Sequence, residues 1–370
     1  MGKTMKKIAL YIPSMNGGGA ERVMLTLANA LAEKDKISID LVLNRAGGVY
    51  LKDISDKVNI VNLNTSRVLK SVIPLSQYLK KEKPDTILSA MNYVNVITVL
   101  AKLISGTNTR VILSEHVNLT SSLKDTKWLF RIAFKNIMKW TYKKSDSIIA
   151  VSNGVADDLS REIKINRNKI VTIYNPIFTP NLLEKAQSAL PLQNPYFDRN
   201  TPPVILGVGR LAEEKDFKTL INAFAKVRNY KECHLMILGE GALRPELELL
   251  IKELDLQDSV QMPGFVDNPH SWMLNADLFV LSSIHEGFGN VLVEAMACGL
   301  PVVSTDCPSG PNEILEDGKW GELVPVGDVE LLSKAIIKVM SKPSKIDVKE
   351  RASFFSVENS VNKYLELLID

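Results

Sequence analysis

The chain has 370 residues, of which 45% are hydrophobic and 24% are charged, and its formal net charge is +3. A chain of this length and composition can bury two cores of ordinary domain size. No apolar run approaches the ~20 residues that a membrane-spanning helix needs, and the N-terminus enters a strand-like run without a signal-peptide pattern. We therefore expect a soluble or peripheral protein of the cytoplasm.

The charge distribution indicates the kind of partner, and the cysteines indicate the redox state of the thiols. Residues 1–190 carry 28 Lys and Arg against 15 Asp and Glu, an excess of +13, whereas the rest carries 17 against 27, an excess of −10. A basic half favours an anionic partner, and a membrane surface, a phosphorylated lipid and a nucleic acid are candidates. Cys233, Cys298 and Cys307 have no short metal-binding spacing, which is typical of buried, reduced thiols.

The first predicted strand, residues 6–13, is followed by three glycines, Gly17, Gly18 and Gly19. A helix with an apolar face runs from there to about residue 33. Glycines between a strand and a helix let the backbone approach a ligand closely, and a helix N-terminus favours an anion. The loop is neither a dinucleotide fingerprint nor a P-loop, because Gly-x-Gly-x-x-Gly and Gly-Lys-Ser/Thr are both absent.

Strand-like runs recur at 39–43, 86–88, 111–114, 147–151 and 170–173, with helical patterns between them. This alternation predicts an α/β fold with a parallel, doubly wound sheet whose ligands bind at the carboxyl ends of the strands. His116 lies just beyond one such end, and Asn92 and Asn118 are weaker candidates for contact with a ligand.

The segment from Lys127 to Lys144 predicts an amphipathic helix. Lys127, Arg131, Lys135, Lys139 and Lys143 recur every four residues, and aromatic and aliphatic residues, Trp128 and Trp140 among them, fill much of the rest. A basic helix rich in aromatic residues suits an anionic bilayer or a phosphorylated lipid. The alternative is a core helix with a solvated basic face.

The first domain ends after a strand near Tyr174. The stretch up to residue 203 is rich in Pro and Asn, so we place the linker there. The second domain begins with the predicted strand 204–210, after which Arg210 and Lys215 flank a loop. Two cations in this position could hold a diphosphate.

The most informative stretch is residues 276–304. A buried strand leads into a loop that contains Glu286, Gly287 and Gly289, and Asn290 is the predicted N-cap of a two-turn helix over 291–297. This arrangement places backbone N–H groups where an anion is favoured. Glu286 before the helix and Glu294 one turn inside it could accept hydrogen bonds from sugar and ribose hydroxyls.

The run from Glu286 to Val303, Glu-Gly-Phe-Gly-Asn-Val-Leu-Val-Glu-Ala-Met-Ala-Cys-Gly-Leu-Pro-Val-Val, resembles the signature of the retaining, nucleotide-sugar-dependent glycosyltransferases of family 4. Gly-Gly-Ala-Glu-Arg at 18–22 and Gly-Arg-Leu-x-x-x-Lys-Asp at 209–216 also match, and the resemblance spans nearly the whole chain. It implies a GT-B fold, in which two Rossmann-like doubly wound domains face each other across a cleft.

We expect an acceptor-binding domain over 1–185, a linker over 186–202, a nucleotide-sugar-binding domain over 203–352, and a C-terminal helix over 353–370 that crosses back to the first domain. By resemblance, His116 faces the transferred sugar, Gly264 and Phe265 line the base pocket, and Arg210 and Lys215 bind the diphosphate. The remaining implied donor-binding residues are Gly17, Gly18, Gly19, Glu286, Gly287, Phe288, Gly289, Asn290, Val291 and Glu294.

The resemblance implies transfer of a hexose or an N-acetylhexosamine, with retention, from a nucleoside diphosphate sugar for which UDP is the expected nucleotide. No Asp-x-Asp motif occurs, so no metal or other cofactor is expected. The basic helix indicates which acceptor to expect. We expect a polyprenyl-diphosphate-linked saccharide of bacterial polysaccharide, lipopolysaccharide or O-antigen assembly. We expect the protein to lie on the anionic inner face of the cell membrane, with no nucleic-acid partner.

Two other classes remain open. One is a GT-B enzyme of different chemistry, such as a sugar-nucleotide epimerase, a hydrolase or a phosphorylase; an epimerase would turn over the donor without an acceptor, and the chain is short for a phosphorylase. The other is a non-enzymatic polyanion-binding module, which would show salt-sensitive binding to nucleic acid that does not depend on Glu286.

Overall fold

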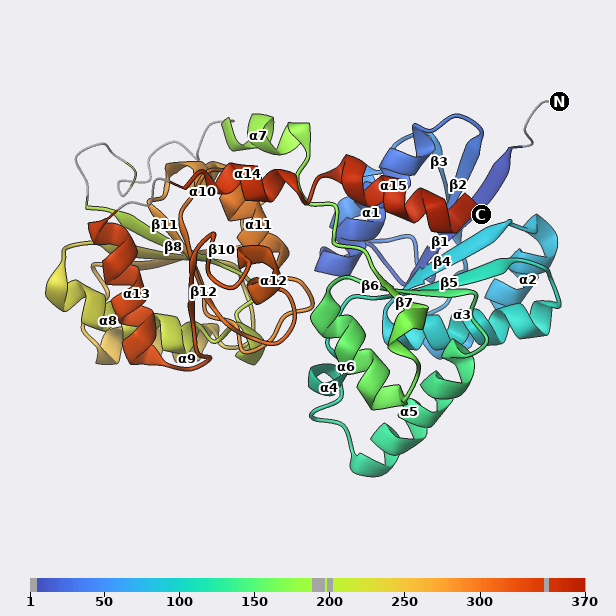
Figure 1. The fold of residues 1–370 in the computed structure, drawn as a ribbon, viewed down its shortest axis with the longest axis horizontal. Helices are drawn as coiled ribbons and strands as arrows, with labels where there is room; N and C mark the ends of the chain where they lie inside the picture. The colour runs from blue at the N-terminus through green and yellow to red at the C-terminus, as the bar shows by residue number, and fades with distance from the viewer. Residues whose placement is uncertain (1–4, 188–196, 198–201, 343–345, 370) are drawn as a thin grey trace. The chain divides into compact units, whose positions relative to one another are not determined.

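The computed structural model describes residues 5–187, 197, 202–342 and 346–369, and the chain divides into two compact units (Figure 1). Unit 1 comprises Met1–Pro176 and Val357–Asp370, and unit 2 comprises Ile177–Ser356. Residues 177–185, which we expected in the first domain, therefore belong to unit 2. Apart from residues 186, 187, 197 and 202, the predicted linker lies outside the described residues.

Unit 1 is built on a seven-stranded sheet in the order β3-β2-β1-β4-β5-β6-β7, with every neighbouring pair parallel. Its central strands are buried along most of their length, as expected for a parallel sheet covered on both faces. The strands are β1 (Lys6–Ile12), β2 (Ile37–Leu43), β3 (Val58–Asn62), β4 (Thr86–Ala90), β5 (Arg110–Glu115), β6 (Ser147–Ala150) and β7 (Ile170–Thr172).

Helices cover both faces of this sheet (Figure 1). The α-helices of unit 1 are α1 (Gly19–Ala32), α2 (Val72–Glu82), α3 (Asn92–Ser105), α4 (Leu119–Ser122), α5 (Trp128–Tyr142), α6 (Asn153–Ile163) and α15 (Val357–Ile369); its 3₁₀ helices are η1 (Val49–Asp53), η2 (Val68–Ser71) and η3 (Arg167–Lys169). The last helix, α15, shares a core with β1 and α1, into which it inserts Val361, Tyr364 and Leu368. Thr86 Oγ1 also donates a hydrogen bond of 2.9 Å to the carbonyl oxygen of Leu368.

Unit 2 repeats the plan with a six-stranded parallel sheet in the order β10-β9-β8-β11-β12-β13. The strands are β8 (Val204–Val208), β9 (His234–Leu238), β10 (Val260–Gly264), β11 (Leu278–Leu281), β12 (Val302–Thr305) and β13 (Glu322–Val324). The helices are α7 (Pro180–Gln187), η5 (Glu213–Lys215), α8 (Phe217–Tyr230), α9 (Arg244–Glu253), α10 (Pro269–Asn275), α11 (Asn290–Ala297), α12 (Pro311–Leu315), α13 (Val329–Ser341) and α14 (Val348–Ser353). Apolar residues of α8, α9 and α13 form one core with the strands.

Both sheets confirm the predicted doubly wound α/β architecture. In each, the strand order reverses beside the first strand of the unit, at the β1/β4 pair and at the β8/β11 pair. Ligands of such folds bind beyond the carboxyl ends of the strands at this reversal. The loops after β1, β4, β8 and β11 are therefore the places to look for a site.

Two further predictions concern the cysteines and membrane-spanning helices. Cys233, Cys298 and Cys307 are buried and free, as predicted, and burial raises the thiol pKa of Cys233 to about 11 and those of the other two to about 12. Within the described residues, no helix has both the length and the apolar character to cross a bilayer.

Candidate active site

The turn between β11 and α11 brings the two strongest sequence candidates into contact. Lys215 Nζ lies 2.5 Å from Glu286 Oε1, and both side chains are mostly shielded from solvent. Ser283 Oγ donates to the same carboxylate oxygen at 2.7 Å. Ser282 Oγ donates to the carbonyl of Lys215 at 2.8 Å and so joins the loop after β11 to the loop after β8. These two loops follow neighbouring strands, which explains why residues 71 positions apart meet.

Helix α11 has no acidic residue in its first turn. Gly289, not Asn290, is the N-cap; its φ of 95° is a backbone conformation that favours glycine. Asn290 is the first residue of the helix, no side chain caps it, and its first turn contains no acidic residue. The partial positive charge of a helix N-terminus therefore meets no carboxylate from this turn.

The loop 308–310, to which the sequence assigned no role, supports this turn. The N–H of Glu286 donates to the carbonyl of Pro308 at 3.2 Å. A side chain at Gly310 would clash, since a Cβ there would lie 1.8 Å from the carbonyl oxygen of Phe288. Phe288 itself is buried and packs edge-on against Phe355, with ring centroids 5.3 Å apart. The side chain of Phe288 therefore packs in the interior of unit 2, and only the backbone of this residue belongs to the glycine turn.

The second predicted glutamate lies inside the unit. Glu294 is 4% exposed, and its Oε2 is 3.6 Å from Nε2 of His270, a buried residue of α10. His270 could not be predicted from the sequence, because a single histidine outside any motif carries no signal. The structure thus places Glu286 in the loop with Lys215 and Glu294 one turn deeper beside a histidine.

The other donor-binding candidates of unit 2 are more dispersed. Arg210 is largely exposed and pairs with Glu214. Gly264 ends β10 with a φ of 94°, and Phe265, which follows it, exposes 68% of its surface. An exposed aromatic ring beyond a strand end is available for stacking on a flat ligand. No hydrogen bond or ion pair among the described residues joins these residues to Glu286.

In unit 1, the glycine loop after β1 already holds a carboxylate. Glu21, in the first turn of α1, accepts a short hydrogen bond from the N–H of Gly18 and one of 3.2 Å from Ser14 Oγ. A Cβ on Gly18 would lie 2.3 Å from Glu21 Oε2, so a larger residue there would require the Glu21 side chain to shift. The Gly18 N–H is therefore occupied by the chain itself, which the sequence did not predict.

His116 directly follows β5, and only one of its two ring nitrogens is within hydrogen-bond distance of another group in the described part of the chain. Its Nε2 is 2.9 Å from Ser114 Oγ, whereas Nδ1 is buried and has no hydrogen-bond partner among the described residues. Burial lowers the pKa of His116 to about 4, so the imidazole is neutral at physiological pH. A buried ring nitrogen without a partner is a plausible point of contact for a ligand hydroxyl.

The side chains of the two weaker candidates, Asn92 and Asn118, make hydrogen bonds within unit 1. Asn118 caps α4, where its side chain accepts from the N–H of Ser121 at 3.0 Å. Asn92 Nδ2 donates to Ser122 Oγ at 3.2 Å. Met91, between β4 and α3, has a φ of 82°, which is strained for a side chain of this size. Such strain marks functional sites often enough to draw attention to the end of β4.

Comparison with known proteins decides the family. Residues 17–179 match the family described as Glycosyltransferase Family 4, and residues 192–354 match Glycosyl transferases group 1. The chain is 31% identical over 376 residues to a protein of Campylobacter jejuni, with 98% of this chain and 100% of that one covered. That relative is named N-acetylgalactosamine-N,N'-diacetylbacillosaminyl-diphospho-undecaprenol 4-alpha-N-acetylgalactosaminyltransferase.

The chain belongs to glycosyltransferase family 4.

Other relatives of this family 4 glycosyltransferase agree. The lipopolysaccharide core biosynthesis glycosyltransferase LpsE of Rhizobium meliloti is 28% identical, with 95% of this chain and 96% of that one covered. The solved structure of HepE from Anabaena in complex with UDP has a TM-score of 0.76 at 21% identity and covers 98% of this chain and 99% of its own. The predicted GT-B fold, with two Rossmann-like units, is thereby confirmed.

Helix α5 of the glycosyltransferase exposes an apolar surface, although not quite as predicted. Its inward-facing residues include Phe134 and Met138, which are buried. Lys135 lies against α6, where it pairs with Glu162, so the basic residues are not all free at the surface. The outward apolar residues, each at least 46% exposed, are Trp128, Leu129, Phe130, Ile132, Ile137 and Trp140.

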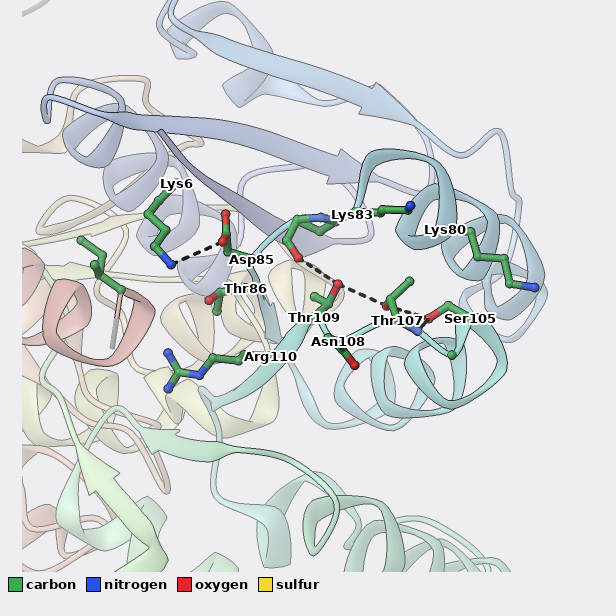
Figure 2. A pocket seen from close by; sticks show the side chains of 13 residues that line it. Lys6, Lys80, Lys83, Asp85, Thr86, Ser105, Thr107, Asn108, Thr109 and Arg110 are labelled. Atoms are coloured by element: carbon green, nitrogen blue, oxygen red, sulfur yellow. Dashed lines mark hydrogen bonds and ion pairs between the residues drawn. The ribbon is translucent and has the colours of Figure 1, made fainter. Parts of the chain in front are cut away.

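A hollow of about 650 Å³ lies elsewhere on unit 1, at the amino ends of β1, β4 and β5 (Figure 2). None of the predicted site residues lines it. It carries four cations, Lys6, Lys80, Lys83 and Arg110, against the single acid Asp85. The charged ends of Lys80 and Arg110 point in opposite directions (Figure 2), so this hollow does not gather its charges on one point.

Among the described residues of the glycosyltransferase, no group of three or more His, Cys, Asp or Glu side chains is placed to hold a metal ion.

Proposed function

We propose that this glycosyltransferase moves a hexose or an N-acetylhexosamine from a nucleoside diphosphate sugar, with UDP as the expected nucleotide, to a saccharide carried on a membrane polyprenyl diphosphate, with retention at the anomeric carbon. The observation that carries the proposal is the contact between Lys215 and Glu286 beside the N-terminus of α11, a helix that has no acidic residue in its first turn.

Departure of the nucleoside diphosphate develops negative charge, and unit 2 offers groups that stabilise it. Lys215 supplies a cation, and the amides at the start of α11 supply oriented N–H donors. Before the donor binds, Glu286 holds Lys215 in place at 2.5 Å. An incoming diphosphate, with more charge than one carboxylate, competes for this lysine and leaves Glu286 to accept hydrogen bonds from sugar hydroxyls. Arg210, on the surface with Glu214, is the second cation for the diphosphate.

The ring of Phe265 and the carboxylate of Glu294 complete the proposed donor site. Phe265 lies beyond the carboxyl end of β10, where an exposed aromatic ring suits a nucleobase. Glu294 is the expected ribose ligand, with His270 at 3.6 Å to hold its orientation. The HepE structure bound to UDP supports uridine as the nucleoside for this fold.

Retention is proposed to follow a front-face path, in which the leaving diphosphate helps to deprotonate the acceptor hydroxyl. Double displacement needs a carboxylate nucleophile near the anomeric carbon. Glu294 is buried, and Glu286 keeps its hydrogen bond from Ser283 and is proposed to accept further ones from sugar hydroxyls, which disfavours both in that role. His116 contributes the unpartnered Nδ1 to a hydroxyl of the transferred sugar. No metal is required in this scheme, because Lys215, Arg210 and the amides supply the charge stabilisation.

The acceptor is proposed to reach unit 1 from a membrane. The C. jejuni relative is named for a diphospho-undecaprenol substrate. Trp128 and Trp140 are 62% and 49% exposed on α5, and Lys127 and Lys143 at its two ends are exposed as well. Exposed aromatic rings together with lysines favour the interface of an anionic bilayer, with which the protein would associate peripherally.

The decisive experiment is a screen of radiolabelled UDP- and GDP-sugars against bacterial lipid extracts, with the configuration of the product determined by NMR. We expect radiolabel from one UDP-sugar in a lipid-extractable product with a retained anomeric configuration. The Lys215→Ala variant, tested in parallel, should form none.

Three outcomes would contradict the proposal. An inverted product would exclude the front-face path. Turnover of the donor without any acceptor would favour the epimerase or hydrolase alternative. Salt-sensitive nucleic-acid binding that survives in Glu286→Ala, without transfer, would favour the polyanion-binding module.

A further inference from the structure

Glu115, the last residue of β5, is a buried carboxylate that the proposed chemistry does not use. It is 1% exposed, and it directly precedes His116 in the sequence. Burial raises its pKa to about 7, and this effect outweighs the opposing hydrogen bonds from Tyr142 and Asn95. A buried carboxylate without a cation destabilises a fold compared with an apolar side chain of similar volume. Its presence at this point therefore calls for an explanation other than stability.

The carboxylate joins three elements of unit 1. Oε1 of Glu115 accepts a short hydrogen bond from the hydroxyl of Tyr142, the last residue of α5, and one of 2.9 Å from Asn95 Nδ2 in α3. Asn95 Nδ2 also lies 3.1 Å from the hydroxyl of Tyr142 and 3.0 Å from the carbonyl oxygen of Ser114. Its own Oδ1 accepts from Ser89 Oγ of β4 at 2.7 Å. The end of β5 is thus held by polar contacts from β4, α3 and α5.

On the other side of the strand, the same residues hold the histidine. Side chains alternate along a strand, so Ser114 and His116 point away from Glu115. Ser114 Oγ lies 2.9 Å from His116 Nε2, while the carbonyl of Ser114 accepts from Asn95. Because Ser114 Oγ engages Nε2, Nδ1 is the ring nitrogen left for a ligand, and the direction of the Ser114 hydrogen bond follows the tautomer of the neutral imidazole. The orientation of Ser114 is therefore linked through its backbone to Asn95 and Glu115.

We propose that Glu115 is a positioning residue for His116: by binding Tyr142 and Asn95 it fixes the end of β5, and with it the Ser114–His116 hydrogen bond that selects the ring nitrogen presented to the substrate. The effect on turnover rests on the proposed role of His116, but the effect on the imidazole does not.

The test measures the imidazole directly. The chain has four histidines, so ¹⁵N-histidine labelling gives a sparse long-range ¹H–¹⁵N spectrum in which a His116→Gln variant assigns the His116 signals. Because the pKa of His116 is about 4, its signals at neutral pH report the tautomer and not protonation. The variants are Tyr142→Phe, which removes the donor hydroxyl, Glu115→Leu, which removes the carboxylate, and Glu115→Gln, which keeps one oxygen acceptor.

Unit 1 supplies a matched control. Tyr78 in α2 donates to Oδ2 of Asp40 in β2 at 2.6 Å, and this is also a buried tyrosine–carboxylate bond. Tyr78→Phe therefore removes the same chemical group from the same unit without touching β5. It separates loss of positioning from a general loosening of the fold.

We expect Tyr142→Phe and Glu115→Leu to change the tautomer pattern of His116, while Glu115→Gln and Tyr78→Phe retain the wild-type pattern. With the UDP-sugar identified by the screen, kcat should fall about 10²-fold in the first two variants with the donor KM unchanged, because a small misplacement of a reacting group has this effect.

Unchanged His116 signals in Tyr142→Phe would overturn the proposal even if Glu115→Leu failed to fold, and so would an equal change in Tyr78→Phe. Full transfer activity in His116→Gln would instead overturn the role proposed for His116 in the reaction, and the spectra would still decide whether Glu115 positions the ring.

Discussion

The two units share a sheet order, but the carboxylates beside their candidate ligand-binding loops have different partners. In unit 1, Glu21 and Glu115 accept hydrogen bonds from neutral donors, namely the N–H of Gly18 and the side chains of Tyr142 and Asn95. In unit 2, Glu286 and Glu214 lie against cations, Lys215 and Arg210. A diphosphate can displace a carboxylate from a cation, because it offers more charge to the same partner. It gains little from the unit 1 loop, where a carboxylate of the chain already occupies an amide.

This difference supports the proposed placement of the donor in unit 2. The donor diphosphate suits unit 2, whose cations are held ready by exchangeable partners and whose α11 lacks an acidic residue in its first turn. Unit 1 offers neutral groups such as the imidazole of His116, which suit hydroxyls. The predictions below are arranged as attempts to break this contrast, from the largest expected effect to the smallest.

Loss of the Lys215–Glu286 pair should have the largest effect. We expect Lys215→Ala and Glu286→Ala to lower kcat about 10²–10³-fold, since each removes a group that we propose acts on the developing charge or on the sugar. Steady-state transfer of radiolabelled sugar measures this. The control is Lys218→Ala, which breaks a more exposed ion pair with Glu246 in the same region. Comparable activity in all three variants would remove the pair from the site.

The buried carboxylate of unit 1 should make stability depend on pH. The pKa of Glu115 is raised from 4.5 to about 7 in the folded state, so its favourable protonated form is fully populated below pH 4.5 and is lost as the pH rises through 7. Relative to wild type, Glu115→Gln should therefore gain about 3 kcal/mol of unfolding free energy between these limits. Urea midpoints of unit 1 at pH 5 and pH 8 measure most of this gain. Parallel pH dependence in the two proteins would show that Glu115 is ionised throughout.

Membrane affinity should belong to unit 1 alone. Replacing Lys127 and Lys143 at the ends of α5 with Gln should weaken binding to phosphatidylglycerol vesicles by about 2 kcal/mol, or about 30-fold, at low salt. Vesicle co-sedimentation measures the affinity. The matched control replaces the exposed Lys334 and Lys342 of unit 2 with Gln. Equal losses in the two double variants would mean that net charge, and not α5, sets the affinity.

An acidic residue at the start of α11 would give this helix a carboxylate in its first turn, as Glu21 gives α1. Asn290→Asp adds a carboxylate of the same shape to the first turn, where it stabilises a helix by up to about 1 kcal/mol. The same charge should repel the donor diphosphate, and we expect the donor KM to rise about tenfold. A thermal melt and a donor titration give the two quantities. Higher stability with an unchanged KM would place the diphosphate away from α11.

Removal of the carboxylate from the first turn of α1 in unit 1 should have the smallest effect on the donor KM. Glu21→Gln weakens the contact with the N–H of Gly18 and should lower stability by about 1 kcal/mol, in the range of a lost helix cap. The donor KM should change less than about threefold, since the proposed diphosphate site lies in unit 2. A donor titration at constant acceptor checks this, and a tenfold rise would return the glycine loop of unit 1 to the donor site.

The buried strands and the glycine turn before α11 could be predicted from the sequence, because short runs of consecutive residues determine them. The buried parallel strands appear as short apolar runs, and the turn before α11 appears as glycines between such a run and a helical period. Strand β3 escaped detection, since it lies at the edge of its sheet and three of its five residues are exposed. The N-cap of α11 was misassigned to Asn290, because the backbone angle of Gly289 decides it and not the side chain.

The contacts that define the candidate site were less accessible. Lys215 and Glu286 were both selected, but their pairing depends on β8 and β11 lying side by side. His270 beside Glu294, and the support of the glycine turn by Gly310, join segments whose separate sequences contain no motif. Tyr142 could be placed on an amphipathic helix, but nothing in that pattern predicts a buried carboxylate at its last turn. Tertiary contacts of this kind follow only from the sheet order.

The path of the chain has a consequence for synthesis on the ribosome. Unit 2 is one continuous segment, Ile177–Ser356, whereas unit 1 is completed only by Val357–Ile369. Until α15 has been translated and released from the exit tunnel, the apolar face of β1 and α1 lacks Val361, Tyr364 and Leu368. The part of the polypeptide made second can therefore reach its native packing before the part made first, and Met1–Pro176, nearly half of the chain, needs protection from aggregation until α15 is available.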